Sequence, residues 1–139
     1  TKEYAPVEWP ATADYETVCA LNAAADKLAY RHATGVVQSK DSFYGQHDPS
    51  SMAAVPALSE KWEAWLRLGA LCSEMETAAL FTVAALRRVR CGSVLHVIAN
   101  QTRRDKGLSD PKVYDTDKAV RTAVEAMRIM IEQDRSKHA

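Results

Sequence analysis

The spacing of apolar and polar side chains predicts one amphipathic helix near each end of the chain. After an extended, proline-containing entry at residues 1–11, the first helix is expected to begin at an N-cap Thr12 and to end near residues 30–31. Its expected buried face is formed by Val18, Leu21, Ala25 and Leu28. The last helix is expected from about Thr116, with a frayed tail at residues 136–139. Its expected buried face is formed by Val120, Ala123, Val124, Met127 and Ile131.

Two runs of β-branched residues predict buried strands, at residues 33–39 and 92–99. The first strand is followed by a polar and aromatic loop at residues 40–49, and the second by a polar segment at residues 100–103. Residues 103–114 are charged and are expected to be irregular.

Two further helices are expected between these strands. One follows a mobile loop at residues 49–58, begins at an N-cap Ser59 and closes at Gly69. The central helix follows the sequence Ser73–Glu76, with Glu76 in its first turn. The alternation of helices and strands predicts an α/β fold in which a three-layer αβα sheet carries helices on both faces.

The ends of the strands are expected to meet at one edge of that sheet. Ligands bind at this edge in such folds, so residues 40–49, 73–76 and 100–103 are expected to face one ligand. In the second of these segments, Glu74 and Glu76 flank Met75 where a strand turns into a helix. These carboxylates could simply complement the helix dipole, or they could accept hydrogen bonds from the vicinal hydroxyls of a sugar.

Composition narrows the class of protein further. The chain has 139 residues, enough for one compact domain, and 47% of them are hydrophobic. Its 18 basic residues equal its 18 acidic residues, which argues against nucleic acid or an anionic membrane as its main partner. No apolar run has the length of a membrane span.

Cysteine and histidine usage gives no sign of a disulfide or a metal site. The cysteines Cys19, Cys72 and Cys91 lack CxxC spacing and are expected to be buried free thiols in a reducing cytosol. The four histidines are scattered without the spacing of metal ligands, so neither a metal nor another cofactor is expected. The expectation of free thiols in a reducing compartment also predicts a cytoplasmic location.

Four motifs in order resemble those of the nucleoside phosphorylase family, in particular its uridine phosphorylase branch. They are Tyr4-Ala5-Pro6 with Pro10-Ala11, then Ser39 to Gln46, then Glu74-Met75-Glu76, and then Asn100-Gln101-Thr102. The resemblance covers essentially residues 1–139, which would form the C-terminal, nucleoside-binding part of a single domain of that family.

The resemblance implies a role for each motif residue. Glu76 would hold the 2′- and 3′-hydroxyls of a ribose, Met75 would line the sugar, and Glu74 would support both. Phe43 would pack on the base, and Gln46 would recognise the uracil edge, for which an amide has a suitable donor and acceptor.

Two positions depart from the family pattern. Asp48 stands where an arginine usually supports the departing base, and Lys40 or His47 is expected to substitute for it. Asn100-Gln101 stands where the purine branch carries an acid that protonates N7, which favours a pyrimidine substrate.

The activity implied by the resemblance is reversible phosphorolysis of uridine to uracil and ribose 1-phosphate, in pyrimidine salvage. Phosphate would be the co-substrate, and no covalent catalytic residue is required. The phosphate site is expected upstream of Thr1, so the 139-residue chain alone is expected to be inactive and to need a companion segment or chain. A homo-oligomer is expected. The alternatives are a non-catalytic protein that binds a nucleoside or a partner, and, third, a purine nucleoside phosphorylase or nucleosidase.

Overall fold

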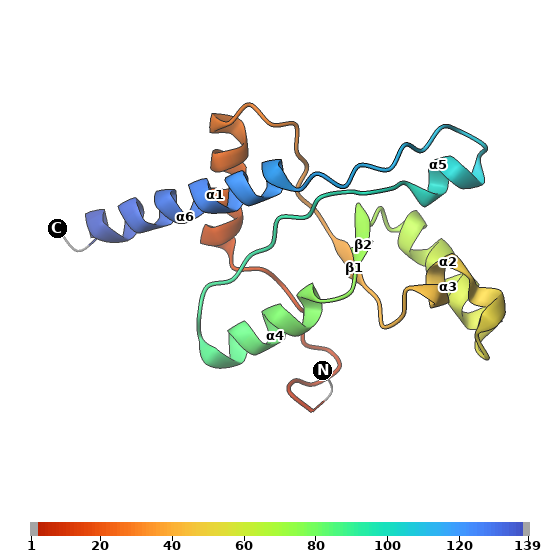
Figure 1. Ribbon diagram of the computed structural model, residues 1–139. Coiled ribbons are helices and arrows are strands. Elements are labelled where there is room, and N and C mark those ends of the chain that lie inside the picture. Colours follow the sequence, from red (N-terminus) through yellow and green to blue (C-terminus); the bar gives the residue numbers. More distant parts are fainter. Residues whose placement is uncertain (1–2, 138–139) are drawn as a thin grey trace. The chain divides into compact units, whose positions relative to one another are not determined.

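A computed structural model describes residues 3–137 and divides them into two compact units, each of which is described by itself (Figure 1). The first unit comprises residues 3–12 and 33–89, and the second comprises residues 13–32 and 90–137. The chain contains helices and parallel strands, as expected for an α/β protein.

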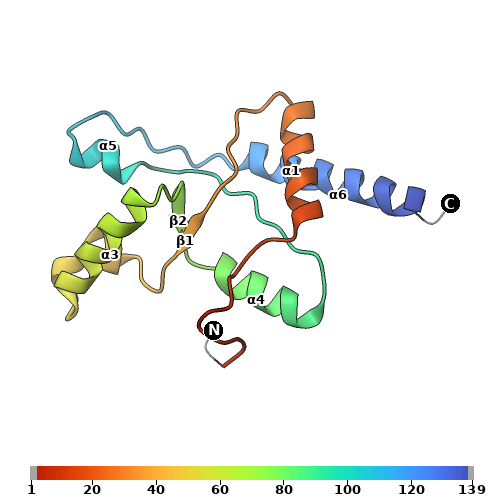
Figure 2. The same ribbon diagram turned by 180° about the vertical axis from the view of Figure 1, so that it is seen from behind.

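The first unit contains a pair of parallel strands with helices after each. Its elements are β1 (Val37–Ser39), α2 (Tyr44–His47), the 3₁₀ turn η1 (Pro49–Ser51), α3 (Val55–Arg67), β2 (Cys72–Glu74) and α4 (Thr77–Arg87). Ser39 at the end of β1 is in register with Glu74 at the end of β2. Both strands therefore end at the same edge, and Figure 2 shows them side by side with α4 leading away from β2.

The helix predicted from Ser59 begins earlier and ends where expected. It starts at Val55, with Pro56 in its first turn, because the fixed φ of proline suits that position without a side-chain cap. Residues 49–58, expected to be a mobile loop, therefore contain η1 and the start of α3. Gly69 closes the helix as predicted: it has a φ of 76°, and its N–H donates to the carbonyl of Leu66 over 3.1 Å.

The second unit contains α1 (Tyr15–Lys27), α5 (Gln101–Asp105) and α6 (Asp117–Lys137). The N-cap of α1 is Asp14 and not Thr12, because the Asp14 carboxylate accepts hydrogen bonds from both the N–H and the hydroxyl of Thr17, each at 2.8 Å. The predicted end of α1 was also too late by about three residues. Short α5 covers the first residues of the segment 103–114 that was expected to be irregular.

The core of the second unit lies where α1 crosses α6. Small side chains lie at the crossing, and two ion pairs join the helices, Lys27 with Glu125 at 2.5 Å and Lys137 with Glu16 at 2.8 Å. The buried apolar residues at this crossing are Ala20, Ala24, Ala126 and Met130. Of the predicted buried face of α1, Ala25 is buried as expected, and the other three residues are half-buried.

The predicted buried face of α6 is wrong. Val120, Val124 and Met127 are exposed by 57%, 47% and 58% of their surfaces, and Ile131 is exposed too. The face that packs on α1 instead contains Thr122, Glu125, Ala126 and Met130. Periodicity identified an apolar stripe but not the neighbour that α6 contacts: Ala20 and Ala24 of α1 pack with Ala126 and Met130, which lie on another face of α6.

The predicted strand at residues 92–99 is also not formed in the part of the chain that the structure describes. A strand exists only where a neighbouring backbone completes its ladder of hydrogen bonds. Here the Val113 N–H donates to the Ile98 carbonyl over 3.0 Å, and the His96 ring lies 2.8 Å from the Val113 carbonyl. The predicted strand at residues 33–39 is confirmed only over its last three residues, in β1.

The cysteines are less buried than expected. Cys19 is exposed, which contradicts the prediction, because it lies on the side of α1 turned away from the alanine crossing. Cys72 and Cys91 are half-buried, and burial raises the pKa of both thiols. None of the helices described at residues 3–137 is both long and apolar enough to cross a membrane.

Candidate functional site

The corner between β2 and α4 is held together by the carboxylate of Glu74. Its Oε2 accepts hydrogen bonds from the backbone N–H groups of Glu76 and Thr77, both at 2.6 Å. Its Oε1 accepts from the hydroxyl of Thr77 at 2.6 Å and from the hydroxyl of Ser39. Glu74 therefore caps the start of α4 and ties it to the end of β1.

The corner folds this way because the first turn of a helix has N–H groups without partners in the helix. Glu74 satisfies two such donors, and Ser39 accepts from the N–H of Ala78 over 3.0 Å. Burial by itself would raise the pKa of Glu74. The hydrogen bonds from Ser39, Thr77 and the two backbone amides outweigh burial, so that the pKa is lowered and the charged carboxylate is favoured.

Met75 and Glu76 lie on the outside of this corner. Met75 is 42% exposed and Glu76 is exposed, with its Oε2 accepting from the Met75 N–H over 3.2 Å. Glu76 occupies the N-cap position just before α4, one residue before the first turn in which it was predicted. Its carboxylate can accept hydrogen bonds from the hydroxyls of a ligand at this edge.

A cluster of polar side chains centres on the ammonium group of Lys40, directly after β1. The Lys40 N–H donates to the Glu74 carbonyl over 2.9 Å, which continues the pairing of the two strands. Its Nζ lies 2.8 Å from Gln46 Oε1, 3.2 Å from His47 Nε2 and 3.3 Å from Ser73 Oγ. Burial lowers the pKa of Lys40.

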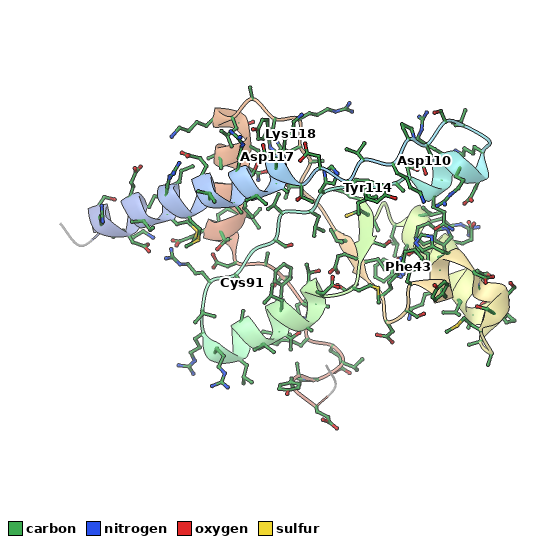
Figure 3. All side chains as sticks on the ribbon, viewed as in Figure 1. Phe43, Cys91, Asp110, Tyr114, Asp117 and Lys118 are labelled. Atoms are coloured by element: carbon green, nitrogen blue, oxygen red, sulfur yellow. The ribbon has the colours of Figure 1, made fainter. Side chains whose placement is uncertain are left out.

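An aromatic side chain lies beside this cluster. Phe43, labelled in Figure 3, is 52% exposed, and its ring centroid is 4.2 Å from that of His47 and 5.2 Å from Lys40 Nζ. The short helix α2 lies where a loop was predicted, and it turns Gln46 and His47 back towards Lys40. The arrangement places a partly exposed ring next to an amide and a cation, suited to a flat polar ligand.

The structure brings together two of the three predicted loops. The loop after β1 and the corner after β2 share contacts through Lys40, Ser73 and Glu74, within the first unit. The third segment belongs to the second unit, where Asn100 caps α5 by accepting from the Arg103 N–H over 2.9 Å. Its convergence on the other two stays a prediction.

Three hydroxyl side chains contribute to the site although no individual role was predicted for them from the sequence: Ser39, Ser73 and Thr77. Their positions in the sequence could have indicated such a role, because each hydroxyl lies at or beside the end of β1 or β2, next to a proposed ligand-binding residue. Asp48, which the resemblance placed at the position of a family arginine, accepts from the Ser50 hydroxyl over 2.6 Å and so helps to form η1.

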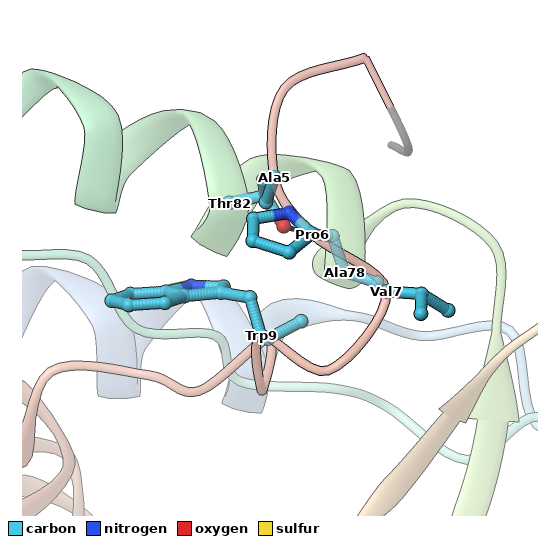
Figure 4. Close-up of a pocket in the computed structure, with 7 residues that line it drawn as sticks. Ala5, Pro6, Val7, Trp9, Ala78 and Thr82 are labelled. Carbon is cyan, nitrogen blue, oxygen red and sulfur yellow. Dashed lines mark hydrogen bonds between the residues drawn. The ribbon is translucent and has the colours of Figure 1, made fainter.

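A small hollow forms where the entry segment packs on α4. Figure 4 shows Pro6 and Trp9 on one side and Ala78 and Thr82 of α4 on the other. Its volume is about 140 Å³ and its lining is mostly apolar. Ala5 and Pro6 of the Tyr4-Ala5-Pro6 motif are among the residues that line it. No three His, Cys, Asp or Glu side chains gather as metal ligands within residues 3–137.

Comparison with known proteins gives a consistent result. The family model of the phosphorylase superfamily matches residues 2–132. The chain is 54% identical over 134 residues to uridine phosphorylase of Treponema pallidum, covering 96% of this chain and 52% of the relative. It is 35% identical over 131 residues to that of Escherichia coli, covering 92% of this chain and 52% of the relative. It is 36% identical over 139 residues to that of Thermococcus kodakarensis, covering 99% of this chain and 48% of the relative.

The chain thus spans about half the length of the curated relatives it matches. The motifs that carry the sequence resemblance lie within the matched residues, and the resemblance itself is confirmed. The chain belongs to the phosphorylase superfamily.

Proposed function

We propose that the protein catalyses the reversible phosphorolysis of uridine to uracil and ribose 1-phosphate. One observation carries the proposal: the exposed carboxylate of Glu76 and the cluster around Gln46 and Phe43 lie at the same ends of two paired parallel strands. One set suits a sugar with vicinal hydroxyls, and the other suits a flat base with polar edges. The names of the similar proteins support the same chemistry.

The corner after β2 would bind the ribose. Glu76 would accept hydrogen bonds from the 2′- and 3′-hydroxyls, while the partly exposed side chain of Met75 would pack against the sugar. Glu74, with both oxygens engaged by the protein, would support the corner and need not touch the substrate.

The loop after β1 would bind the base. Phe43 would stack on it, and Gln46 would recognise its polar edge, assisted by Lys40 and His47. In the reaction the C1′–N1 bond breaks with its electron pair going to uracil, and a phosphate oxygen forms the new bond to C1′. A cation near the base stabilises the negative charge that develops on uracil, which needs no covalent catalyst.

The proposal extends to the rest of the domain. Residues 1–139 would form the nucleoside-binding part of a three-layer αβα domain, completed by a companion segment that supplies the phosphate site. The 139 residues alone would then not turn over uridine. Without positioned phosphate, the reaction loses a contribution that can reach about 7–11 kcal/mol. We propose a cytoplasmic homo-oligomer that needs phosphate as co-substrate and no cofactor.

Steady-state phosphorolysis by the protein as its gene encodes it tests this proposal. Uridine should be cleaved, with phosphate dependence, far better than inosine or adenosine, since no acid is expected near a purine N7. A preference for either purine nucleoside would overturn the assignment to the uridine branch, and the absence of any phosphorolysis would overturn the enzymatic proposal.

One observation favours a second candidate, a protein that binds nucleosides without turnover. Asp48 is used to form a turn and, when ionised, cannot donate to a departing base as an arginine would. This candidate predicts that uridine and uracil bind with measurable heat in a calorimeter, while no ribose 1-phosphate forms at any phosphate concentration.

A further inference from the structure

We infer that Ser39 is a positioning residue for the ribose: its hydroxyl holds the carboxylate of Glu74, which in turn holds the backbone that carries Glu76. The inference rests on the proposed function, because it concerns how the same corner binds the sugar of a nucleoside. Ser39 acts through Glu74 and does not touch the substrate. Loss of its hydroxyl should therefore weaken the binding of a nucleoside but not that of a free base.

The hydroxyl of Ser39 joins three elements of the first unit. A serine hydroxyl has one hydrogen to donate and two lone pairs that can accept. The Ser39 hydroxyl donates to Oε1 of Glu74, and its oxygen accepts from the Ala78 N–H over 3.0 Å. Ser39 ends β1, Glu74 ends β2 and Ala78 lies in the first turn of α4. This hydroxyl therefore ties both strand ends to the start of the helix.

The carboxylate of Glu74 fixes the backbone of the residue proposed to bind the sugar. Its Oε1 accepts from the hydroxyls of Ser39 and Thr77. Its Oε2 accepts from the backbone N–H groups of Glu76 and Thr77, both at 2.6 Å. Two hydrogen bonds on each oxygen use the acceptor sites of the carboxylate and restrain its rotation. The position of the Glu76 backbone thus depends on Glu74, and the orientation of Glu74 depends in part on Ser39.

The hydrogen bond from Ser39 differs in kind from the one donated by Thr77. Thr77 lies three residues from Glu74 and moves together with the corner, whereas Ser39 lies on the neighbouring strand, 35 positions away in the chain. The Ser39 bond therefore holds the corner in place relative to the loop that follows β1. A nucleoside needs this relation, because its sugar and its base are joined and must meet the corner and the loop together. A site that is already in place binds more tightly than one that binding must order.

Calorimetric titration of uridine and of uracil, without phosphate, into the protein as its gene encodes it tests the inference. Uracil has no sugar, so its affinity does not depend on the corner. Ser39→Ala should raise the Kd for uridine roughly tenfold, about 1.4 kcal/mol, and leave the Kd for uracil within about twofold. Ser39→Thr keeps the hydroxyl and should restore the affinity for uridine. Ser59→Ala removes a hydroxyl from an exposed position of α3 and is the matched control, which should change neither Kd.

A double-mutant cycle shows whether Ser39 acts through Glu76. Glu76→Ala removes the side chain that is proposed to bind the sugar, so the position of its backbone no longer matters for uridine. Adding Ser39→Ala to Glu76→Ala should then raise the Kd for uridine by less than about twofold, because the two changes act on the same contact. A full tenfold effect in both backgrounds would mean that Ser39 does not act through Glu76.

Each outcome decides the inference. An unchanged Kd for uridine in Ser39→Ala, an equal loss for uridine and uracil, or full additivity with Glu76→Ala would overturn it and leave the proposed function intact. If Ser39→Ala does not fold, Ser39→Cys carries the same expectation, because a thiol is a weak donor. If the unmodified protein binds uridine no better than uracil, the ribose contact and the inference fall together. If it binds uridine as expected but forms no ribose 1-phosphate once phosphate is added, the catalytic proposal falls and the inference stands.

Discussion

Replacing Glu74 by glutamine tests how much the Glu74 carboxylate stabilises the corner between β2 and α4. The change keeps the shape of the side chain but removes the charge and one acceptor oxygen. The best arrangement of the new amide leaves its oxygen on the N–H groups of Glu76 and Thr77. Its nitrogen then faces the hydroxyls of Ser39 and Thr77, which must turn over to accept.

The expected cost follows from the number of bonds affected. A hydrogen bond to a charged group contributes about 1.5–3 kcal/mol and a neutral one about 0.5–1.5 kcal/mol, a difference of about 1 kcal/mol per bond. Two backbone bonds lose this charge assistance, which gives about 2 kcal/mol. Because the corner is only half-buried, solvent screening reduces the figure, and we expect Glu74→Gln to lower the free energy of unfolding by about 1–2 kcal/mol.

Urea unfolding at neutral pH measures this loss, and Glu76→Gln is the matched control. Glu76 is exposed and accepts one backbone N–H, so its replacement should change the free energy of unfolding by less than about 0.5 kcal/mol. Equal effects of the two variants would refute the assignment of a clamping role to Glu74 alone.

The same clamp should show a pH dependence of known sign. The hydrogen bonds hold the pKa of Glu74 below its ordinary value of 4.5, so near that pH the folded protein binds fewer protons than the unfolded chain. The contribution of Glu74 is therefore complete above pH 4.5 and is lost as the pH falls through the lowered value. The difference in free energy of unfolding between the unmodified protein and Glu74→Gln should shrink on acidification.

Two further predictions concern the second unit and the thiols. Gly92→Ala should lower the free energy of unfolding by about 1–3 kcal/mol, because the added Cβ would lie 2.5 Å from Thr17 Cγ2; an unchanged urea midpoint would show that the two segments separate easily. A maleimide reagent should label Cys19 before Cys72 and Cys91, because Cys19 is exposed and burial raises the pKa of the other two; mass spectrometry after partial labelling would contradict this if Cys72 reacts first.

Local signals in the sequence predicted local features well. Gly69 marked the end of α3 because only a residue that tolerates a positive φ fits that position easily. The corner at Glu74–Glu76 was also predicted from a local signal, because the change from a strand pattern to a helix pattern is visible within a few residues. The predicted N-cap, Thr12, lies two residues before the observed one, Asp14, because both side chains can cap a helix and the sequence alone does not show which one does.

Features that depend on distant neighbours could not be predicted in this way. The stripe from Val120 to Ile131 has a regular apolar spacing, yet α6 packs on α1 through Ala126 and Met130. Likewise, a supporting role was expected for Glu74, but its hydrogen bond with Ser39 was not, because Ser39 is 35 positions away in the chain. The polar cluster around Lys40 was found only as separate residues, since its geometry arises from the turn of α2.

The most direct test of the central claim is the rate of uridine phosphorolysis by Glu76→Gln in the protein as its gene encodes it. The account assigns Glu76 to the ribose and not to stability, so kcat/KM for uridine should fall by roughly 10²-fold, as for loss of a charged hydrogen bond to substrate. The urea midpoint should stay within the error of the unmodified protein. Activity within a few-fold of the unmodified protein would contradict the placement of the ribose at this corner.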